Sequence, residues 1–444
     1  MKSKKLVAIG AVIATAALGL TGCAGNSGSG DVTLKYGLWD ANQLPSYQQC
    51  AADFTKETGI KVDVEQIGWD DYWAKINNGF VSGDNYDVFT SHLAFYPEFV
   101  NSKQILPLDT SKNGIDLSIY QDGLAELWTS PSGDQYGLPK DFDTIAMFYN
   151  ENDLAPAGIT KEQIDNMTWN PTDGGTYEQV IAALTVDKNG VHGNQPGFDK
   201  NNVATYGIWM QGSGDGDGQT QWSFLTGTND WTHTNGVWGD KYNYDSPKFQ
   251  ETIAWWKSLQ DKGYMPTWEA QDGVSWNEQL AAGTVAMASN GSWMIGSVFG
   301  SANDTFKPAV APTPVGPNGK RASMYNGLAD NIWAGTKHPE EAQKLVAYLG
   351  SPACEDVVAG NAVVFPAIKT STEKAQAAFT AKGVDVEPFL VHVKDGTTFL
   401  FPITDHRADI GAIMKPAMEA VMSGKAGVET LTDANKKVND LFKK

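Results

Sequence analysis

The sequence predicts an α/β protein with more than one domain. Residues 32–102 alternate between strand and helix patterns, the order that builds a sheet of parallel neighbouring strands covered by helices. The chain has 444 residues, too many for one compact core, so two or three domains are expected. With 41% hydrophobic and 19% charged residues, the composition is that of a globular protein.

The first elements follow from hydrophobic periodicity. Alternation at period two indicates strands, and apolar residues three and four apart indicate helices. Gly59 stands at the position where glycine commonly ends a helix. The patterns predict strands at residues 32–36, 60–64 and 86–89 and helices at 46–58, 71–81 and 94–102.

Later elements rely more on helix boundaries. Ser246 before Pro247 is typical of a helix start, and Thr370 with Glu373 has the spacing of a capping box. No internal repeat is visible in the sequence. We expect strands at residues 144–149, 206–210 and 284–289, and helices at 177–185, 246–262, 276–282, 339–349, from 370, 405–423 and 428–442.

The N-terminal segment has the pattern of an export signal. Three lysines precede an apolar run, residues 6–20, that is shorter than the about 20 residues needed to span a bilayer. Leu20-Thr21-Gly22-Cys23 resembles the bacterial lipobox, which implies lipidation of Cys23. Residues 1–22 are therefore expected to be a signal peptide, and 23–30 a lipidated, flexible tether to the outer face of the cell membrane. The alternative is an ordinary signal peptide with an incidental cysteine.

Charge and motifs exclude several functions. The formal net charge of −19 argues against nucleic acid, which is bound through lysine and arginine, and disfavours anionic ligands. No zinc or phosphate-loop motif occurs, so we expect no metal, no cofactor and no ATP hydrolysis by this chain. Residues 214–218 faintly resemble a calcium loop but lack its ligand order, and we interpret them as a flexible loop. Cys50 and Cys354 could pair in an oxidising compartment, but the sequence does not show their separation.

Tryptophans are unusually placed. The chain has 15 of them, and many stand beside Gly, Asn, Asp or Ser rather than beside aliphatic residues, as core tryptophans usually do. Trp255-Trp256 fits a core position, whereas the others are expected to be rings presented from loops. The loop-flanked set is Trp39, Trp69, Trp231, Trp238, Trp276 and Trp293.

Several segments in order resemble one family, the maltose-binding-protein-like solute-binding proteins of bacterial sugar ABC importers. Each segment alone is a weak signal, but their order and spacing cover nearly the whole chain. They are residues 54–62, 136–139 with 143–150, 281–287 with 290–293, and 337–342 continuing to 352.

The resemblance implies a periplasmic-binding-protein-like type II fold. Two discontinuous α/β lobes would be joined by a three-segment hinge, with the ligand cleft between them. The expected N-terminal lobe comprises residues 31–141 and 289–331, and the expected C-terminal lobe 142–288 and 332–444.

A sugar cleft needs two kinds of side chain. Sugar hydroxyls need directional polar partners, and the flat C–H faces of the ring match tryptophan. Asp143 takes the position where the family places an acid against sugar hydroxyls, while strand ends and loops favour the others. The candidate ligand-binding residues are Trp39, Asp40, Asp87, Ser91, His92, Asp143, Trp231, Trp276, Asn290, Trp293, Asn326, Asn331, Trp333 and Arg407.

The predicted function is capture of an oligosaccharide, of two to four units, for delivery to an ABC permease. The resemblance implies binding by lobe closure without bond chemistry, and we expect a monomer. The main alternative is a lipid-anchored surface glycoside hydrolase, which would also carry acids and aromatic rings. A binding protein for peptides or polyols and a structural surface protein are further alternatives.

Overall fold

The computed structural model describes residues 32–443. The expected signal peptide, the lipidated Cys23 and the tether lie outside the described residues. None of the described helices is both long and apolar enough to cross a membrane.

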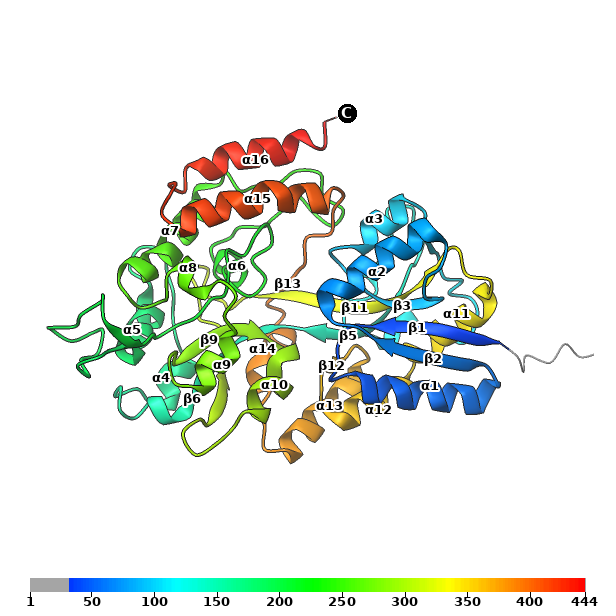
Figure 1. The fold of residues 1–444 in the computed structure, drawn as a ribbon, viewed down its shortest axis with the longest axis horizontal. Coiled ribbons are helices and arrows are strands. Elements are labelled where there is room, and N and C mark those ends of the chain that lie inside the picture. Colours follow the sequence, from blue (N-terminus) through cyan, green and yellow to red (C-terminus); the bar gives the residue numbers. More distant parts are fainter. Residues whose placement is uncertain (1–31, 444) are drawn as a thin grey trace, which may run out of the picture.

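The strands gather into two main sheets, one in each half of the molecule (Figure 1). The larger sheet has the order β12-β5-β11-β3-β1-β2, with β4 and β13 also pairing with β11, and the smaller has the order β10-β6-β9. The strands are β1 (Thr33–Leu38), β2 (Lys61–Gln66), β3 (Val88–His92), β4 (Ile105–Leu106), β5 (Leu138–Asp143), β6 (Ile145–Asn150), β7 (Val186–Asp187), β8 (Val203–Thr205), β9 (Met287–Gly291), β10 (Pro308–Ala311), β11 (Ser323–Trp333), β12 (Phe365–Pro366) and β13 (Thr398–Leu400).

Helices cover both sheets. In the half that contains the larger sheet, α1 and α12 lie on one side of that sheet, and α2 and α3 lie on the other (Figure 1). The α-helices are α1 (Leu44–Thr58), α2 (Trp69–Ser82), α3 (Tyr96–Asn101), α4 (Lys161–Asp165), α5 (Gly175–Leu184), α6 (Ser223–Thr228), α7 (Pro247–Asp261), α8 (Trp268–Gln271), α9 (Trp276–Ala281), α10 (Ile295–Gly300), α11 (Pro339–Leu349), α12 (Pro352–Asn361), α13 (Lys369–Ala381), α14 (Glu387–Lys394), α15 (Arg407–Met422) and α16 (Thr430–Asp440).

The first elements match their predictions closely. β1 pairs in parallel with β2 and with β3, as expected for alternating strands and helices. Gly59 ends α1 with a φ of 77°, in the left-handed region that favours glycine. Two local predictions are wrong. Residues 206–210 form only isolated bridges, and α13 begins at Lys369 after Ile368, so Thr370 does not cap it.

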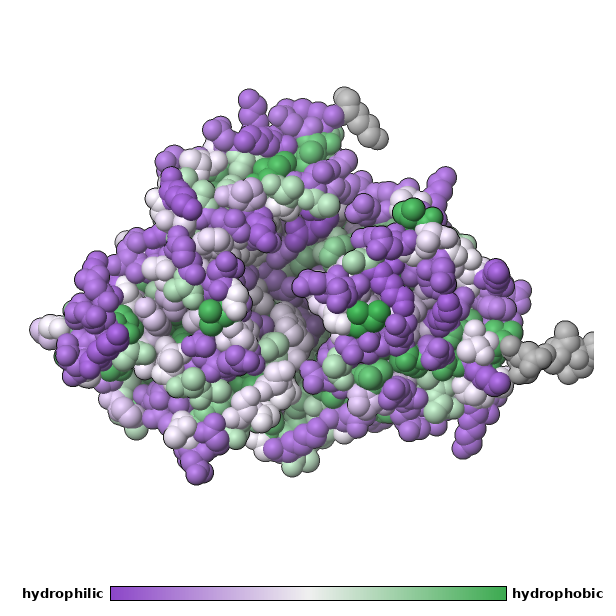
Figure 2. All heavy atoms as spheres, in the orientation of Figure 1, coloured by the Kyte–Doolittle hydropathy of each residue, from purple (hydrophilic) through white to green (hydrophobic). Residues whose placement is uncertain are grey.

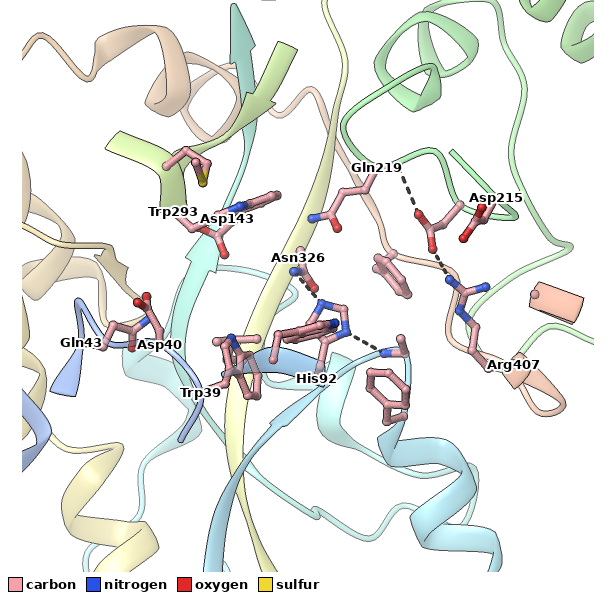
Figure 3. Close-up of a pocket in the computed structure, with 18 of the residues that line it drawn as sticks. Trp39, Asp40, Gln43, His92, Asp143, Asp215, Gln219, Trp293, Asn326 and Arg407 are labelled. Carbon is pink, nitrogen blue, oxygen red and sulfur yellow. Dashed lines mark hydrogen bonds and ion pairs between the residues drawn. The ribbon is translucent and has the colours of Figure 1, made fainter. Parts of the chain in front are cut away.

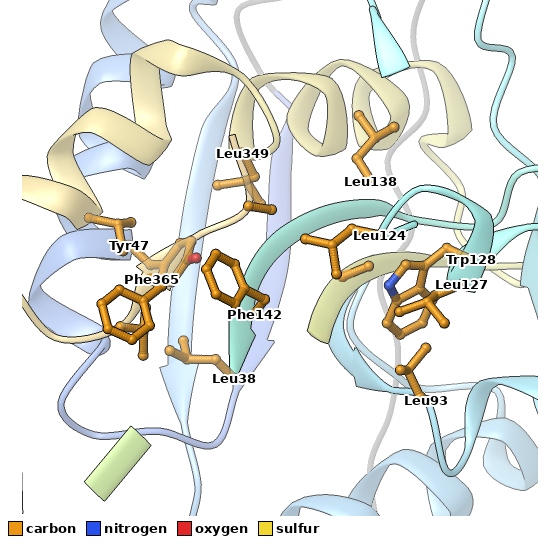
Figure 4. Close-up of a cluster of buried hydrophobic side chains, with 14 of the residues drawn as sticks. Leu38, Tyr47, Leu93, Leu124, Leu127, Trp128, Leu138, Phe142, Leu349 and Phe365 are labelled. Carbon is orange, nitrogen blue, oxygen red and sulfur yellow. The ribbon is translucent and has the colours of Figure 1, made fainter. Parts of the chain in front are cut away.

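Each lobe has its own hydrophobic core. The core of the first lobe lies around the larger sheet and includes Phe142, Trp128 and Phe365 (Figure 4). The second core lies around the smaller sheet and α7, with Trp222, Trp256 and Met287 fully buried. The first cluster continues into residues of the smaller sheet such as Phe148, so the two cores meet at the junction of the lobes.

The chain division differs from the predicted lobe boundaries in two ranges. β9 and β10 both pair with β6, which keeps residues 287–311 in the second lobe although 289–331 was expected in the first. Helices α11 to α13 belong to the first lobe although 332–444 was expected in the second, because α11 and α12 pack on α1 and β12 pairs with β5. Both differences involve β11, which spans the junction of the lobes. It pairs with β13 at its start and with β3 and β4 at its end.

A disulfide ties these distant parts of the first lobe together. Cys50 of α1 and Cys354 of α12 are bonded, with 5.2 Å between their Cα atoms. The structure thus answers the open question of whether these two cysteines pair. The predicted boundaries had placed Cys354 in the other lobe, whereas α12 packs on α1.

Candidate ligand-binding site

A cavity of about 850 Å³ lies between the two lobes, where the surface is hollowed in Figure 2. This volume falls within the about 300–1,000 Å³ typical of small-molecule sites. Both lobes contribute to the lining, and Figure 3 shows their side chains pointing into the same space. We call this cavity the cleft; its lining includes Trp39, Asp40, Gln43, Trp69, His92, Phe95, Asp143, Asp215, Asp217, Gln219, Trp293, Asn326, Phe401 and Arg407.

The wall from the first lobe is aromatic. Trp39 follows β1 and Trp69 begins α2, and their ring centroids lie 5.0 Å apart in an edge-on arrangement. Trp69 also meets the ring of His92 at 5.6 Å, and Phe95 stacks on Trp73 at 4.1 Å. These contacts hold the rings in place, while Trp69 keeps 42% of its surface exposed. The wall therefore offers an ordered apolar face at the carboxyl ends of β1 and β3.

His92 is held as a neutral imidazole on this wall. Burial, with a smaller contribution from the nearby Arg407 charge, lowers the pKa of His92 to about 3. Its Nδ1 accepts the backbone N–H of Ala94 at 3.0 Å, so the ring proton must sit on Nε2. The side-chain amide of Asn326 lies 3.1 Å from Nε2. Because two donors cannot pair, the amide must turn its oxygen toward His92.

Asp143 closes the floor of the cleft at the end of β5. Its Oδ1 accepts a hydrogen bond from Ser292 Oγ at 2.7 Å, which links the first lobe to the second. Burial, reinforced by the neighbouring charge of Asp141, raises the pKa of Asp143 well above its usual range. Burial also raises the pKa of Asp141 to about 7, against the attraction of Lys140. The floor thus holds carboxyl groups that resist ionisation, beside the buried ion pair of Lys140 Nζ and Asp330 Oδ1 at 3.2 Å.

The wall from the second lobe is polar and is built on the loop at residues 213–218. Asp217 forms an ion pair with Arg407 at the start of α15, and its Oδ1 accepts the backbone N–H of Gln219 at 3.2 Å. The loop is also fixed through its backbone, because the Asp217 carbonyl lies 2.8 Å from His233 Nε2. Asp215 lies beside this ion pair and lines the same space (Figure 3).

Half of the predicted site residues line the cleft. They come from both lobes and include the floor carboxyl group. This set is Trp39, Asp40, His92, Asp143, Trp293, Asn326 and Arg407. Whether each contacts a ligand stays a prediction.

The predicted tryptophans outside the cleft are packed in the interior. Trp231 is 5% exposed, stacks on Phe249 at 4.7 Å and donates its ring N–H to the Asn243 carbonyl. Trp276 begins α9 and packs on Phe148 at 5.7 Å. Trp333 ends β11 beside β4. Polar sequence neighbours therefore did not mark Trp231 and Trp276 as surface residues.

The four remaining candidates brace strands. Asp87 accepts the backbone N–H of Lys35 and the hydroxyl of Thr336, and Ser91 lies fully buried in β3. Asn290 accepts the backbone N–H of Gly291 within β9, and Asn331 donates to the Tyr136 carbonyl. Each has a backbone or strand role that the sequence could not distinguish from ligand binding.

Several cleft residues were missed by the prediction. Trp69 belongs to the loop-flanked tryptophans, but a helix start was not weighed as a ligand position. Asp215 and Asp217 lie in the loop interpreted as flexible, which the structure anchors to Arg407 and His233 instead. Among the described residues, no group of three or more acidic, histidine or cysteine side chains could hold a metal ion. Phe95 and Phe401 gave no sequence signal beyond hydrophobicity.

The two-lobed architecture with a cleft at the junction defines a periplasmic-binding-protein-like type II fold, as expected from the sequence. Residues 40–354 match the model of the bacterial extracellular solute-binding protein family, and the chain belongs to that family. A binding protein of Brucella abortus is 23% identical over 439 residues, with 97% of each chain covered.

Solved structures show the same similarity. The crystal structure of M. tuberculosis UspC has a TM-score of 0.72 at 25% identity, covering 93% of this chain and 100% of that one. An ABC substrate-binding protein of Listeria monocytogenes in complex with cycloalternan has a TM-score of 0.77 at 17% identity, covering 93% and 99%.

Proposed function

We propose that this chain is a lipid-anchored substrate-binding protein that captures an oligosaccharide by closure of its lobes and delivers it to an ABC permease. It would act as a monomer on the outer face of the cell membrane, without chemical change to the sugar. The two unlike walls of the cleft are the single observation that carries the proposal.

The chemistry of those walls matches the two surfaces of a sugar. The flat C–H faces of a pyranose ring would stack on Trp69 and Trp39, where stacking loses little side-chain entropy. Its hydroxyls would meet Asp215, Gln219 and the Arg407–Asp217 pair on the other wall. Carboxylates accept hydrogen bonds from sugar hydroxyls, and a guanidinium donates hydrogen bonds to them. The polar wall can therefore pair with a hydroxyl both as a donor and as an acceptor.

The size of the cleft supports a ligand of two to four sugar units. Its about 850 Å³ and its several rings exceed what one monosaccharide face would use. Proteins of the same fold have been solved with mannobiose, with mannotriose and with cycloalternan, although one was solved with tagatose, a monosaccharide. The chain length of the ligand is therefore a quantity for measurement.

Export and anchoring rest on the leader sequence. Lys2, Lys4 and Lys5, the apolar run at 6–20 and Cys23 support processing to a diacylated N-terminal cysteine. Membrane fractionation of cells expressing the full chain tests this, with Cys23→Ser as the variant. We expect the wild type in the membrane fraction and the variant released from it, whereas equal distribution would contradict anchoring.

Calorimetric titration tests the binding proposal. The mature chain is titrated with gluco-, manno-, xylo- and galacto-oligosaccharides of one to six units, and the sugar is analysed afterwards by chromatography. We expect saturable binding of one linkage class and recovery of the intact sugar. The absence of a binding heat with every sugar would refute sugar binding. Recovery of shortened sugars would favour the glycoside hydrolase instead.

A further inference from the structure

A second hollow lies on the far side of the loop at residues 213–218. It has a volume of about 310 Å³, at the lower end of the about 300–1,000 Å³ range of ligand sites. We call it the side hollow. Asp215 and Asp217 line both the cleft and the side hollow, so the two spaces meet at this loop.

We propose that the side hollow is an additional carbohydrate subsite, which takes the outer units of an oligosaccharide that extends past Asp215 from the cleft. This inference rests on the proposed function of the cleft and concerns the length of the ligand. Three observations carry it: a tryptophan, a buried amide without a full set of partners, and the balance of charge.

Trp268 supplies the apolar face. It begins α8 after Thr267, whose side chain accepts the backbone N–H of Ala270 and so fixes the helix start. The ring is partly exposed, unlike the interior Trp276 that begins the next helix. A partly exposed indole in a polar hollow is the element that a sugar ring needs for stacking.

Gln271 supplies the unpartnered polar group. It lines the side hollow and is only 2% exposed. Its Nε2 donates to the Pro266 carbonyl at 2.9 Å, whereas its buried Oε1 has no hydrogen-bond partner. Buried acceptors are normally paired, and a sugar hydroxyl is a donor of the kind that Gln271 Oε1 lacks.

Charge excludes an anionic occupant. The residues that line the side hollow include one cation, Lys415, and four carboxylates. One of these carboxylates, Asp217, is paired with Arg407, which leaves Asp215, Asp272 and Glu419. A neutral polyhydroxylated unit avoids repulsion from these carboxylates and uses them as acceptors. The loop between the two spaces would then contact the ligand from both sides.

The test is a length series measured by calorimetry on the mature chain. Linear oligosaccharides of two to six units are used, of the linkage that binds the cleft, on the wild type and on Trp268→Ala. We expect affinity to rise with length up to the unit that reaches the side hollow. Trp268→Ala should weaken binding of the longest sugars about tenfold and leave the shortest within twofold of the wild type.

Two further variants keep the outcome clear. Glu269→Ala, on the same short helix but outside both linings, should behave as the wild type at every length. Lys415→Ala, on α15 rather than α8, should also weaken only the longer sugars, and this test does not depend on whether the Trp268→Ala variant folds. If Trp268→Ala lowered the affinity equally for sugars of every length, or for none of them, the proposed subsite would be wrong. The proposal that the cleft binds sugar would still stand. Absence of binding by the wild type would instead refute the proposed function.

Discussion

The two lobes contribute to the cleft in opposite ways. The first lobe presents rings that contact one another at the ends of β1 and β3 and at the start of α2, over a core that is closed by the Cys50–Cys354 disulfide. The second lobe presents a glycine-rich loop with Asp215 and Asp217, held by Arg407 and His233. The difference teaches that the apolar lining of the cleft is built on strand and helix ends, whereas its polar lining is built on a loop that an ion pair and backbone contacts hold in place.

The largest effect is expected from removing the disulfide of the first lobe. Replacing Cys50 and Cys354 by serine should lower the free energy of unfolding by about 2–5 kcal/mol. The bond joins α1 to α12 outside the cleft, so sugar affinity at a temperature well below melting should stay unchanged. Calorimetric melting together with titration checks both parts. A loss of affinity without loss of stability would show that the disulfide shapes the aromatic wall directly.

The next effect concerns the aromatic wall itself. Trp69→Ala removes the most exposed ring of the cleft, and we expect a loss of about 2 kcal/mol in binding, or about 30-fold in Kd. Val81→Ala is the matched control, because Val81 lies on the same helix but is 91% exposed and outside the cleft. Equal Kd values for Trp69→Ala and the wild type would remove the first lobe from ligand recognition.

A third test uses the pH dependence of stability on the same wall. The pKa of His92 is about 3 in the folded chain, below the value of about 6.5 for an unfolded histidine. Between these values the unfolded state binds a proton that the folded state does not, so stability falls as pH falls below about 6.5. The contribution reaches about 2 kcal/mol at pH 5.

His92→Gln should therefore flatten the loss of stability between pH 6.5 and pH 5, as measured by chemical denaturation at each pH. The partly exposed His338 provides the control variant His338→Gln, which should keep the wild-type slope. An unchanged slope in His92→Gln would contradict the assignment of a neutral, buried imidazole beside Asn326.

The smallest effect is expected on the polar wall. Asp217→Asn breaks the ion pair with Arg407. The side chain of Asp217 is 18% exposed and that of Arg407 is 20% exposed, so water partly screens the pair. We expect a loss of about 1 kcal/mol in sugar binding, or about fivefold in Kd. Arg407→Met should cost a similar amount, and the double variant no more than either single one. Additive losses would mean that the two residues act on the ligand separately rather than as one unit.

The same contrast explains how much the sequence could predict. The early strands and α1 were predicted in the right order and place, with ends that differ by up to three residues, because period-two alternation and Gly59 are local signals. Trp39, Asp40 and His92 were correctly predicted to lie near one another, because they stand at or just after the ends of parallel strands, whose ends meet at one edge of a sheet. Asp217 was missed because its position depends on Arg407, which lies 190 positions further along the chain. The lobe boundaries failed for the same reason, since α12 is assigned by its packing on α1 and not by any local pattern.

A structure of the complex with the sugar selected by calorimetry tests the central claim most directly. The account predicts one oligosaccharide held between the lobes, with a ring stacked on Trp69 and hydroxyls bonded to Asp215 or Gln219. A sugar that contacts only one lobe, or that lies outside the cleft, would contradict it.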